Sequence, residues 1–300
     1  MHDTVIVGGG IAGLTAALYA SRKRMDYRII SSEMGGQFYA SGEILNYPGV
    51  VETDGVEFQK TMEEQMRKND VEVVRETVEK VERAGEDFNV ITDKREYETK
   101  TVILATGARP RKLGVPGEEK LLKKGVTYCS ICDGPLFNAM DVAVIGGGNS
   151  ALEAVDFIGD IASKIYVLTN EAEFRAHEYL QEKAKDNPKV EAMFNADIKE
   201  IAGDEFVNSL KYEADGRERT IDVKGVIIEI GRTPNTENFK DLVETDNEGH
   251  IKVDCRAQTS TAGVFAAGDC TDGHEYQYVI AAGQGCMALL KAARYLAMNR

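Results

Sequence analysis

The sequence predicts an α/β protein with two parallel sheets, because one order of strand, glycine-rich loop and helix occurs twice. The apolar run Thr4-Val5-Ile6-Val7 leads into Gly8-Gly9-Gly10 and a stretch with helical character, and Ala143-Val144-Ile145-Gly146-Gly147-Gly148 repeats that order. Short apolar runs at 71–97 and 188–230 predict further strands, the first group in an antiparallel sheet. We therefore expect three-layer sandwiches around parallel sheets, with small antiparallel sheets in addition.

The first glycine loop has the spacing of a dinucleotide-binding fingerprint. Gly8, Gly10 and Gly13 form a Gly-x-Gly-x-x-Gly between a predicted strand and a predicted helix. There the first glycine permits a tight turn, the second lets backbone approach a pyrophosphate, and the third lets the helix pack on the strand. Glu33 follows Gly13 by twenty residues, where an acid can accept hydrogen bonds from a ribose hydroxyl. The alternative is that these glycines serve only the turn.

The second glycine loop predicts a second dinucleotide site. Gly146 and Gly148 occupy the first two fingerprint positions, and Ala151 occupies the third. The strand predicted at 164–168 ends near Glu171, which again follows the last fingerprint position by twenty residues. An acid at this distance is typical of ribose binding.

The C-terminal segment supplies one more strand, loop and helix. An apolar strand that starts at Gly263 ends in Gly268-Asp269, and a helical tail is expected from 281 to 298. Such a loop can present a carboxylate and helix N-terminal amides to a polyol and a phosphate. A plain connection without a ligand is the alternative.

The middle of the chain contains a candidate redox site, the Cys-x-x-Cys of Cys129 and Cys132, followed by Asp133. Two cysteines at this spacing can close a small disulfide ring, and a helical turn that begins at Cys132 would favour its thiolate. Asp133 can donate a proton to a departing thiolate if desolvation raises its pKa. The other cysteines and the histidines stand singly, so no metal is predicted. Two unreactive buried thiols are the alternative.

Composition restricts the classes of partner. The net charge of -14 argues against nucleic acid and anionic membrane surfaces, because both favour lysine and arginine. No apolar run approaches the ~18 residues of a membrane span, and no signal peptide precedes the first predicted strand. We therefore expect a cytoplasmic protein, and in that reducing compartment a Cys-x-x-Cys is more often catalytic than structural.

Together these motifs resemble the low-molecular-weight thioredoxin reductases, flavoproteins of the disulfide reductase superfamily with two dinucleotide-binding domains. The resemblance covers nearly the whole chain. Besides the two glycine loops, it rests on Gly35-Gly36-Gln37, Asn46-Tyr47-Pro48-Gly49, Ala105-Thr106-Gly107-Ala108, Cys129 to Asp133 and Gly268-Asp269. The position of the cysteines in the second domain distinguishes this family, because the related glutathione and lipoamide reductases carry their redox cysteines in the first domain.

The resemblance implies two Rossmann-like domains, of which the second is inserted in the first. Residues 1–113 and 242–300 would form an FAD-binding domain, and residues 114–241 a pyridine-nucleotide-type domain that carries the cysteines. The resemblance further implies a homodimer whose two domains rotate relative to one another, so that the disulfide and the nicotinamide meet the flavin in turn. The reduced cysteines would then face a thioredoxin-like protein.

The resemblance also implies roles for individual residues. Cys132 corresponds to the cysteine that touches the flavin, Cys129 to the one that attacks the partner disulfide, and Asp133 to the proton donor. Gly268 and Asp269 would hold the ribityl and phosphate side of FAD. The other positions carried over are Gly8, Gly10, Gly13, Glu33, Gly36, Gln37, Asn46, Thr106, Gly107 and Gln277 for FAD, and Gly146, Gly148, Ala151, Glu171 and Arg175 for the second dinucleotide.

The sequence departs from the family at two places that concern the electron donor. Members that use NADPH have a His-Arg-Arg triplet where this chain has Thr169-Asn170-Glu171, and Glu171 would repel a 2′-phosphate. An Arg-Gln pair near the flavin appears here as Tyr276-Gln277. We therefore expect NADH to be favoured over NADPH, with Arg175 the nearest cation if NADPH is used. Reduced deazaflavin or ferredoxin as donor, and a redox-sensing flavoprotein without turnover, are the alternatives.

Overall fold

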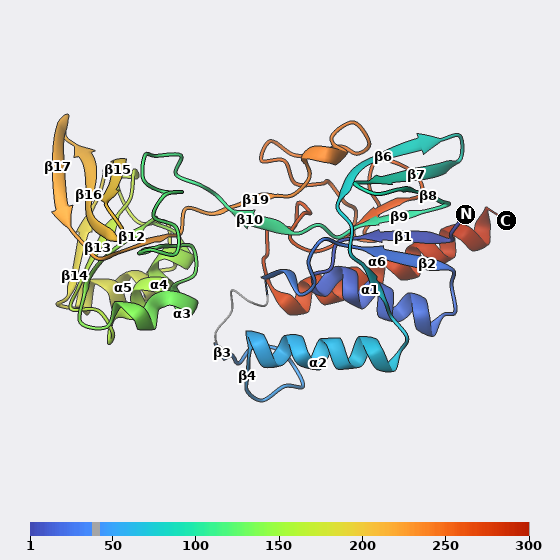
Figure 1. Cartoon of the computed structure of the whole chain (residues 1–300), viewed down its shortest axis with the longest axis horizontal. Helices are drawn as coiled ribbons and strands as arrows, with labels where there is room; N and C mark the ends of the chain where they lie inside the picture. Colours follow the sequence, from blue (N-terminus) through green and yellow to red (C-terminus); the bar gives the residue numbers. More distant parts are fainter. Residues whose placement is uncertain (38–42, 300) are drawn as a thin grey trace. The chain divides into compact units, whose positions relative to one another are not determined.

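The computed structural model describes residues 1–37 and 43–299, apart from the side chains of Glu43 and Cys132. Within these residues the chain forms two compact units, whose elements are labelled in Figure 1. The first unit comprises residues 1–37, 43–109 and 233–299, and the second comprises residues 110–232. The second unit is thus an insertion in the chain of the first.

A parallel sheet forms the centre of the first unit. Its described strands pair in the order β20-β9-β1-β2-β5, and every pair is parallel. The strands are β1 (Thr4–Val7), β2 (Tyr27–Ile30), β5 (Val73–Val74), β9 (Val102–Leu104) and β20 (Val264–Ala266). β1, β9 and β20 are buried along their whole length, which explains why they are continuous apolar runs and do not alternate.

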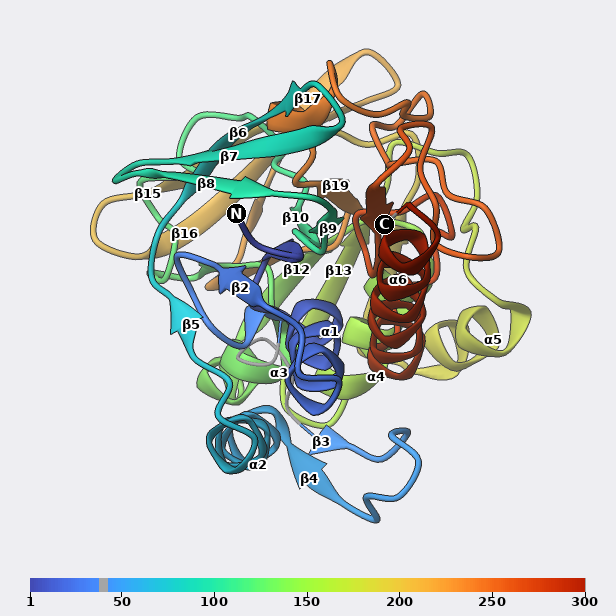
Figure 2. The same cartoon turned by 90° about the vertical axis from the view of Figure 1, so that its right-hand side faces the viewer.

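Helices cover one face of this sheet. The helices are α1 (Ile11–Arg22), α2 (Gly55–Lys68) and α6 (Tyr278–Met298), and they share one apolar core with the sheet. Figure 2 shows α1 and α6 side by side along this face. Gly285 permits their close approach, because a Cβ there would lie 2.1 Å from the carbonyl oxygen of Ala12.

An antiparallel sheet covers the opposite face (Figure 2). It consists of β6 (Val78–Ala84), β7 (Asp87–Thr92) and β8 (Glu96–Thr99), and it shares a second core with the parallel sheet. The prediction that Val73 and Val74 belong to this antiparallel sheet is wrong, since they form β5 and pair in parallel with β2. A two-residue apolar strand has no periodicity that could distinguish the two sheets.

The second unit has the same three layers. Its described parallel strands pair in the order β11-β18-β12-β13-β14. They are β11 (Val126–Thr127), β12 (Asp141–Ile145), β13 (Lys164–Leu168), β14 (Val190–Met193) and β18 (Gly225–Ile228). Helices α4 (Asn149–Ile158) and α5 (Glu178–Asp186) pack on one face. On the other face lie the antiparallel strands β15 (Asp197–Gly203), β16 (Val207–Ala214) and β17 (Arg217–Asp222).

These two units confirm the predicted α/β class with two parallel sheets and small antiparallel sheets. The remaining described elements are short: β3 (Glu43–Ile44), β4 (Thr53–Asp54), β10 (Ala108–Pro110), α3 (Ser130–Asp133), the 3-10 turns η2 (Gly134–Phe137) and η3 (Glu237–Phe239), and β19 (Arg232–Pro234), which pairs with β10. None of the helices formed by residues 1–37 and 43–299 is long and apolar enough to cross a membrane.

Candidate functional site

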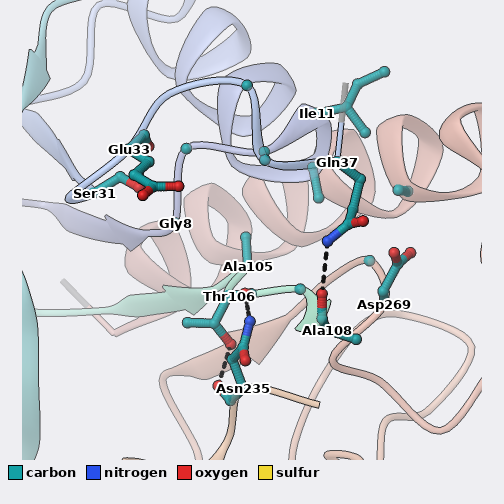
Figure 3. A pocket seen from close by; sticks show the side chains of 18 of the residues that line it. Gly8, Ile11, Ser31, Glu33, Gln37, Ala105, Thr106, Ala108, Asn235 and Asp269 are labelled. Carbon is teal, nitrogen blue, oxygen red and sulfur yellow. Dashed lines mark hydrogen bonds between the residues drawn. The ribbon is translucent and has the colours of Figure 1, made fainter. Parts of the chain in front are cut away.

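The first unit contains a cleft of about 330 Å³ at the carboxyl ends of its parallel strands (Figure 3). This is the edge at which open α/β sheets bind their ligands. Figure 3 shows Ser31 and Glu33 on one side of the cleft, and Gln37 and Asp269 on the other. The predicted FAD residues that line it are Gly8, Gly10, Glu33, Gly36, Gln37, Thr106, Gly107, Gly268 and Asp269.

The three fingerprint glycines of this cleft have three different surroundings. Gly8 has a φ of +115°, and a Cβ there would lie 2.2 Å from the carbonyl oxygen of Ala105. A Cβ at Gly13 would lie 1.9 Å from the carbonyl oxygen of Gly8, whereas among the described residues no atom lies within 4 Å of a Cβ placed at Gly10. Gly8 and Gly13 are therefore required by the protein's own packing, and Gly10 keeps space open at the cleft.

Two helices begin at the cleft with the positive ends of their dipoles. Gly10 is the N-cap of α1 and Gln277 is the N-cap of α6, and the first turn of α1 lines the cleft through Ile11 and Ala12. Within the described part of the chain, neither N-cap residue caps the first amides of its helix through a side chain, and neither first turn holds an acid. Such termini favour anionic groups.

Three predicted FAD residues, Gly13, Asn46 and Gln277, do not line the cleft. Gly13 lies inside α1, where it packs on the loop. Asn46 donates a hydrogen bond from Nδ2 to Oε1 of Gln277 over 3.3 Å, so these two side chains meet at the start of α6. The structure therefore brings Asn46 and Gln277 together without placing them in the wall of the cleft.

Asn235 and Arg109, which the sequence analysis did not single out, stabilise the wall of the cleft. Thr106 donates to the carbonyl oxygen of Asn235 over 2.7 Å, and Asn235 donates from Nδ2 to the carbonyl oxygen of Thr106 over 2.9 Å. Arg109 donates to Oδ1 of Asn235 over 2.7 Å. Asn235 and Thr106 are far apart in sequence, and the only local feature near Asn235 is the pair of turn-forming residues Gly231 and Pro234 before it.

The cysteine turn lies in the second unit, between β11 and the first turn of α3. The amide of Cys129 donates to Oγ1 of Thr127 over 3.0 Å, and Cys129 is disulfide-bonded. The short helix begins at Ser130 and contains Cys132, so the helical turn starts two residues before Cys132. The side chain of Cys132 lies outside the described part of the structure. Asp133 is half-buried, and its amide donates to the carbonyl oxygen of Cys129 over 3.3 Å.

A buried acid anchors this turn. Glu118 is almost fully buried and accepts hydrogen bonds from the amides of Leu113 and Gly114 and from the hydroxyl of Tyr128, at 2.9, 2.7 and 2.7 Å. Burial and the neighbouring Glu118 both raise the pKa of Tyr128, so the phenol stays a donor. Nothing in the sequence indicated this anchor, because Glu118 lies in a polar segment, Glu118-Glu119-Lys120, without a recognisable motif.

The second unit has a cleft of its own, of about 560 Å³, around the second glycine loop. Gly146 has a φ of +137°, and a Cβ there would lie 2.1 Å from the carbonyl oxygen of Glu229. Within the described residues nothing lies within 4 Å of a Cβ at Gly148, the N-cap of α4. The predicted residues that line this cleft are Gly146, Gly148, Glu171 and Arg175, while Ala151 is buried behind it.

Acids outnumber cations on the wall of the second cleft. The acids are Glu171, Asp197 and Glu229, and the cations of the described lining are Arg111 and Arg175. Arg175 and Glu171 form an ion pair, with 3.3 Å between Nη2 and Oε1. Burial raises the pKa of Glu229 to about 7, an effect that Arg232 opposes and Glu153 reinforces. This part of the site can therefore change charge near neutral pH.

The chain belongs to the pyridine nucleotide-disulphide oxidoreductase family, whose model matches residues 2–285. Its structure is similar to that of thioredoxin reductase from Lactococcus lactis in the FR conformation, with 33% identity, a TM-score of 0.89, and coverage of 99% of this chain and 100% of that chain. It is also similar to a ferredoxin-flavin thioredoxin reductase from Clostridium acetobutylicum, with 29% identity, a TM-score of 0.55 and coverage of 99% and 98%.

Curated relatives carry different activities in their names. A thioredoxin reductase of Mycolicibacterium smegmatis is 38% identical over 99% of this chain and 97% of that protein. An "NADH dehydrogenase" of Bacillus subtilis is 40% identical over 99% of this chain. The chain spans 59% of the length of that Bacillus protein and 60% of a component of the alkyl hydroperoxide reductase of Staphylococcus aureus. The chain is therefore a thioredoxin reductase-like oxidoreductase by fold, and the family leaves its donor and acceptor open.

Proposed function

We propose that this protein is an FAD-dependent disulfide reductase that passes two electrons through Cys129 and Cys132 to a thioredoxin-like protein in the cytoplasm. The observation that carries the proposal is the turn of Cys129, which is disulfide-bonded and directly precedes a helix that contains Cys132 and Asp133. The similarity to a thioredoxin reductase of nearly the same length supports this assignment.

The cleft of the first unit has the features that FAD requires. Gly10 leaves room for a pyrophosphate beside the uncapped start of α1, and Glu33 lies where it can bond a ribose. Asp269 and the amides of the loop around Gly268 would hold the ribityl and phosphate side. Bound FAD would supply the exchange of two electrons between a donor and the cysteines.

The chemistry of the cysteines balances as a thiol–disulfide exchange. The thiolate of Cys129 attacks one sulfur of the partner disulfide, forms a mixed disulfide and releases the other sulfur as a thiolate, to which Asp133 can donate a proton. Cys132 then loses its thiol proton and attacks the sulfur of Cys129, which closes the disulfide of this chain and frees the second sulfur of the partner as a thiolate that takes up that proton. Two electrons and two protons thus move to the partner.

The surface beside the turn supports a protein as the acceptor. Ile131, Leu136 and Met140 are large apolar residues that are exposed close to the cysteines in sequence. Exposed apolar groups of this kind are typical of protein contacts. A small polar disulfide would gain little from them.

The charges of the second cleft support NADH over NADPH as the nicotinamide donor. Because Glu171 is paired with Arg175, a 2′-phosphate would have to separate that pair and would still lie beside the carboxylate. The free 2′-hydroxyl of NADH can instead donate to Glu171. The name of the Bacillus relative agrees with this donor.

Reduced ferredoxin or deazaflavin is the second candidate donor. Tyr276 stands where the family has an arginine near the flavin, and here its hydroxyl lies 2.8 Å from Nε2 of His250. The similarity to a ferredoxin-flavin thioredoxin reductase favours this alternative. A redox-sensing flavoprotein would have the same fold without turnover.

The exposed face of α6 supports the homodimer. Val279, Met287 and Leu290 are large, exposed and apolar, and their spacing places them on one side of the helix. Apolar patches on a soluble surface are commonly covered by a second copy of the chain. Sedimentation of Leu290→Lys beside the unmodified protein tests the dimer, because a charge in that face should shift it to monomer, whereas an unchanged dimer would exclude this face.

Steady-state reduction of a thioredoxin disulfide tests the function. NADH, NADPH, reduced deazaflavin and reduced ferredoxin are supplied separately under anaerobic conditions, and thiols on the thioredoxin are counted. We expect turnover with NADH, no turnover in Cys129→Ser, and a rate lower by ~10²-fold in Asp133→Asn, the usual scale for a lost general acid. Flavin that is reduced by a donor without thiol formation would instead indicate the sensor.

A further inference from the structure

Three possible metal ligands that are distant in sequence meet in the first unit. Asp246, His250 and His274 each offer one ligand atom, and these atoms all lie within 4.8 Å of one another. Tyr276 adjoins them, with its hydroxyl 2.8 Å from Nε2 of His250. The cluster shares no residue with the cysteine turn or with the glycine loop of the first cleft. No sequence motif indicated it, because its histidines stand singly.

His250 points an unused nitrogen into this cluster. The residue is 0% exposed, and within the described residues its Nδ1 has no hydrogen-bond partner. Nδ1 lies 3.6 Å from Oδ2 of Asp246, beyond hydrogen-bonding distance. If Nε2 carries the proton and donates it to Tyr276, Nδ1 presents a lone pair toward Asp246. A buried lone pair without a donor is uncommon in folded proteins, and a metal ion would satisfy it.

Asp246 is held so that only one of its oxygens faces the histidines. Oδ1 accepts hydrogen bonds from the amides of Glu248 and His250, at 2.8 and 2.9 Å. Oδ2 lies 2.9 Å from Nε2 of His274. One oxygen therefore orients the carboxylate, and the other is directed at both imidazoles, as is usual for a ligating carboxylate with a supporting hydrogen-bond shell.

We propose that Asp246, His250 and His274 bind one divalent transition-metal ion, with zinc as the best match. Two imidazoles and a carboxylate form a ligand set that zinc takes readily, with water as the fourth ligand. Tetrahedral ligands at zinc lie about 3.3 Å apart, and the distances from Oδ2 to the two imidazole nitrogens, 2.9 and 3.6 Å, bracket that value. His274 is 44% exposed, which gives an ion an entry path.

The ion would join two segments near the first cleft. His274 and Tyr276 line a small cavity together with Gly268 and Asp269. Ile251 already pairs with Thr271, and its amide donates to the carbonyl oxygen of Cys270 over 2.8 Å. A metal bound at His250 and His274 would add a second link between the segments around residues 250 and 271. It would thereby fix the loop that follows Asp269.

The test is zinc binding by the tag-free, flavin-loaded protein in competition with a chromogenic chelator, with Zn²⁺ alone as the probe. We expect one ion per chain. His274→Gln is the main variant, because its side chain is partly exposed and the substitution should not unfold the protein. Affinity should fall by at least ~10-fold in this variant and by ~10-fold in Tyr276→Phe, since an orienting hydrogen-bond partner typically contributes 10- to 100-fold.

His177→Gln is the matched control, because His177 is exposed and lies outside the cluster in the second unit. Its zinc affinity should equal that of the unmodified protein. A wild-type chain that retains no zinc against the chelator would overturn the proposal, as would equal losses in His274→Gln and His177→Gln. Flavin content, measured in each sample, separates these outcomes from loss of the fold and does not depend on the proposed reductase activity.

Discussion

The two clefts have nearly the same backbone and different charges. At Gly8 and Gly146 a Cβ would lie 2.2 and 2.1 Å from a carbonyl oxygen, and at Gly10 and Gly148 the space is open to the described atoms. The carbonyl beneath Gly8 belongs to Ala105, whereas the one beneath Gly146 belongs to Glu229. The same loop geometry can therefore serve two ligands, and the side chains around it decide which one binds and at which pH.

The largest contrast is expected from filling the open glycine position in each cleft. Gly10 and Gly148 have φ near −77° and −93°, so valine fits the backbone but occupies the space for a pyrophosphate. Gly10→Val should lose FAD, from roughly one per chain to almost none. Gly148→Val should keep FAD and lose reduction by NADH. Absorption spectra and stopped-flow reduction measure both, and loss of FAD in Gly148→Val would show that the clefts are not independent.

The third fingerprint position distinguishes the clefts by packing. Gly13→Ala would place a Cβ 1.9 Å from the carbonyl oxygen of Gly8, and such overpacking should lower the free energy of unfolding by about 3 kcal/mol or more. Ala151→Gly removes a methyl group that is already accommodated and should cost about 1–2 kcal/mol. Urea unfolding of the two variants measures the difference. Equal losses would mean that the first loop can shift to accept a side chain.

Charge at the ribose end of the second cleft should set the choice of nicotinamide. Glu171→Arg removes the partner of Arg175 and places two cations beside a 2′-phosphate, so the ratio of the NADPH to the NADH rate should rise by about 10-fold or more. Glu173→Arg, an exposed change two residues away, is the control. Stopped-flow flavin reduction with both donors decides it, and an equal rise in the control would indicate a general effect of net charge.

The smallest expected effect concerns Glu229. Its pKa of about 7 lies above the ordinary value because burial disfavours the charged form. The folded state therefore holds this proton more tightly than the unfolded state. The resulting contribution of Glu229 to the free energy of unfolding is fully present below about pH 4.5 and is lost as pH rises through about 7. Ionisation also adds a negative charge beside an anionic ligand. The apparent affinity for NADH should fall a few-fold from pH 6 to 8, and Glu229→Gln should remove most of this change.

The sequence predicted the fold better than the side-chain contacts. The glycine loops were readable because each lies between an apolar strand and a helix, and this order determines which edge of the sheet they occupy. The pairing of Glu171 with Arg175 could not be predicted from their spacing of four positions, because residues 171–175 form no helix. The contacts of Asn235 and His250 could not be predicted either, because they join segments that only the tertiary fold brings together.

The start of the helix at the redox site is a detail that the cysteine motif alone does not determine. The helix at the cysteines begins at Ser130 and not at Cys132, so the amides at its start belong to residues that the motif does not mark. A Cys-x-x-Cys fixes the spacing of the sulfurs but not the phase of the helical turn. The hydroxyl of Thr127, which accepts from the amide of Cys129, helps to set that phase.

The central claim is that one chain holds two redox centres in series, a flavin and the disulfide of Cys129. Anaerobic reductive titration of the purified yellow protein measures this directly. Each centre takes up two electrons, so the unmodified chain should consume about four electrons and Cys129→Ser about two. A wild-type chain that is fully reduced by two electrons, with the same value in Cys129→Ser, would contradict the account.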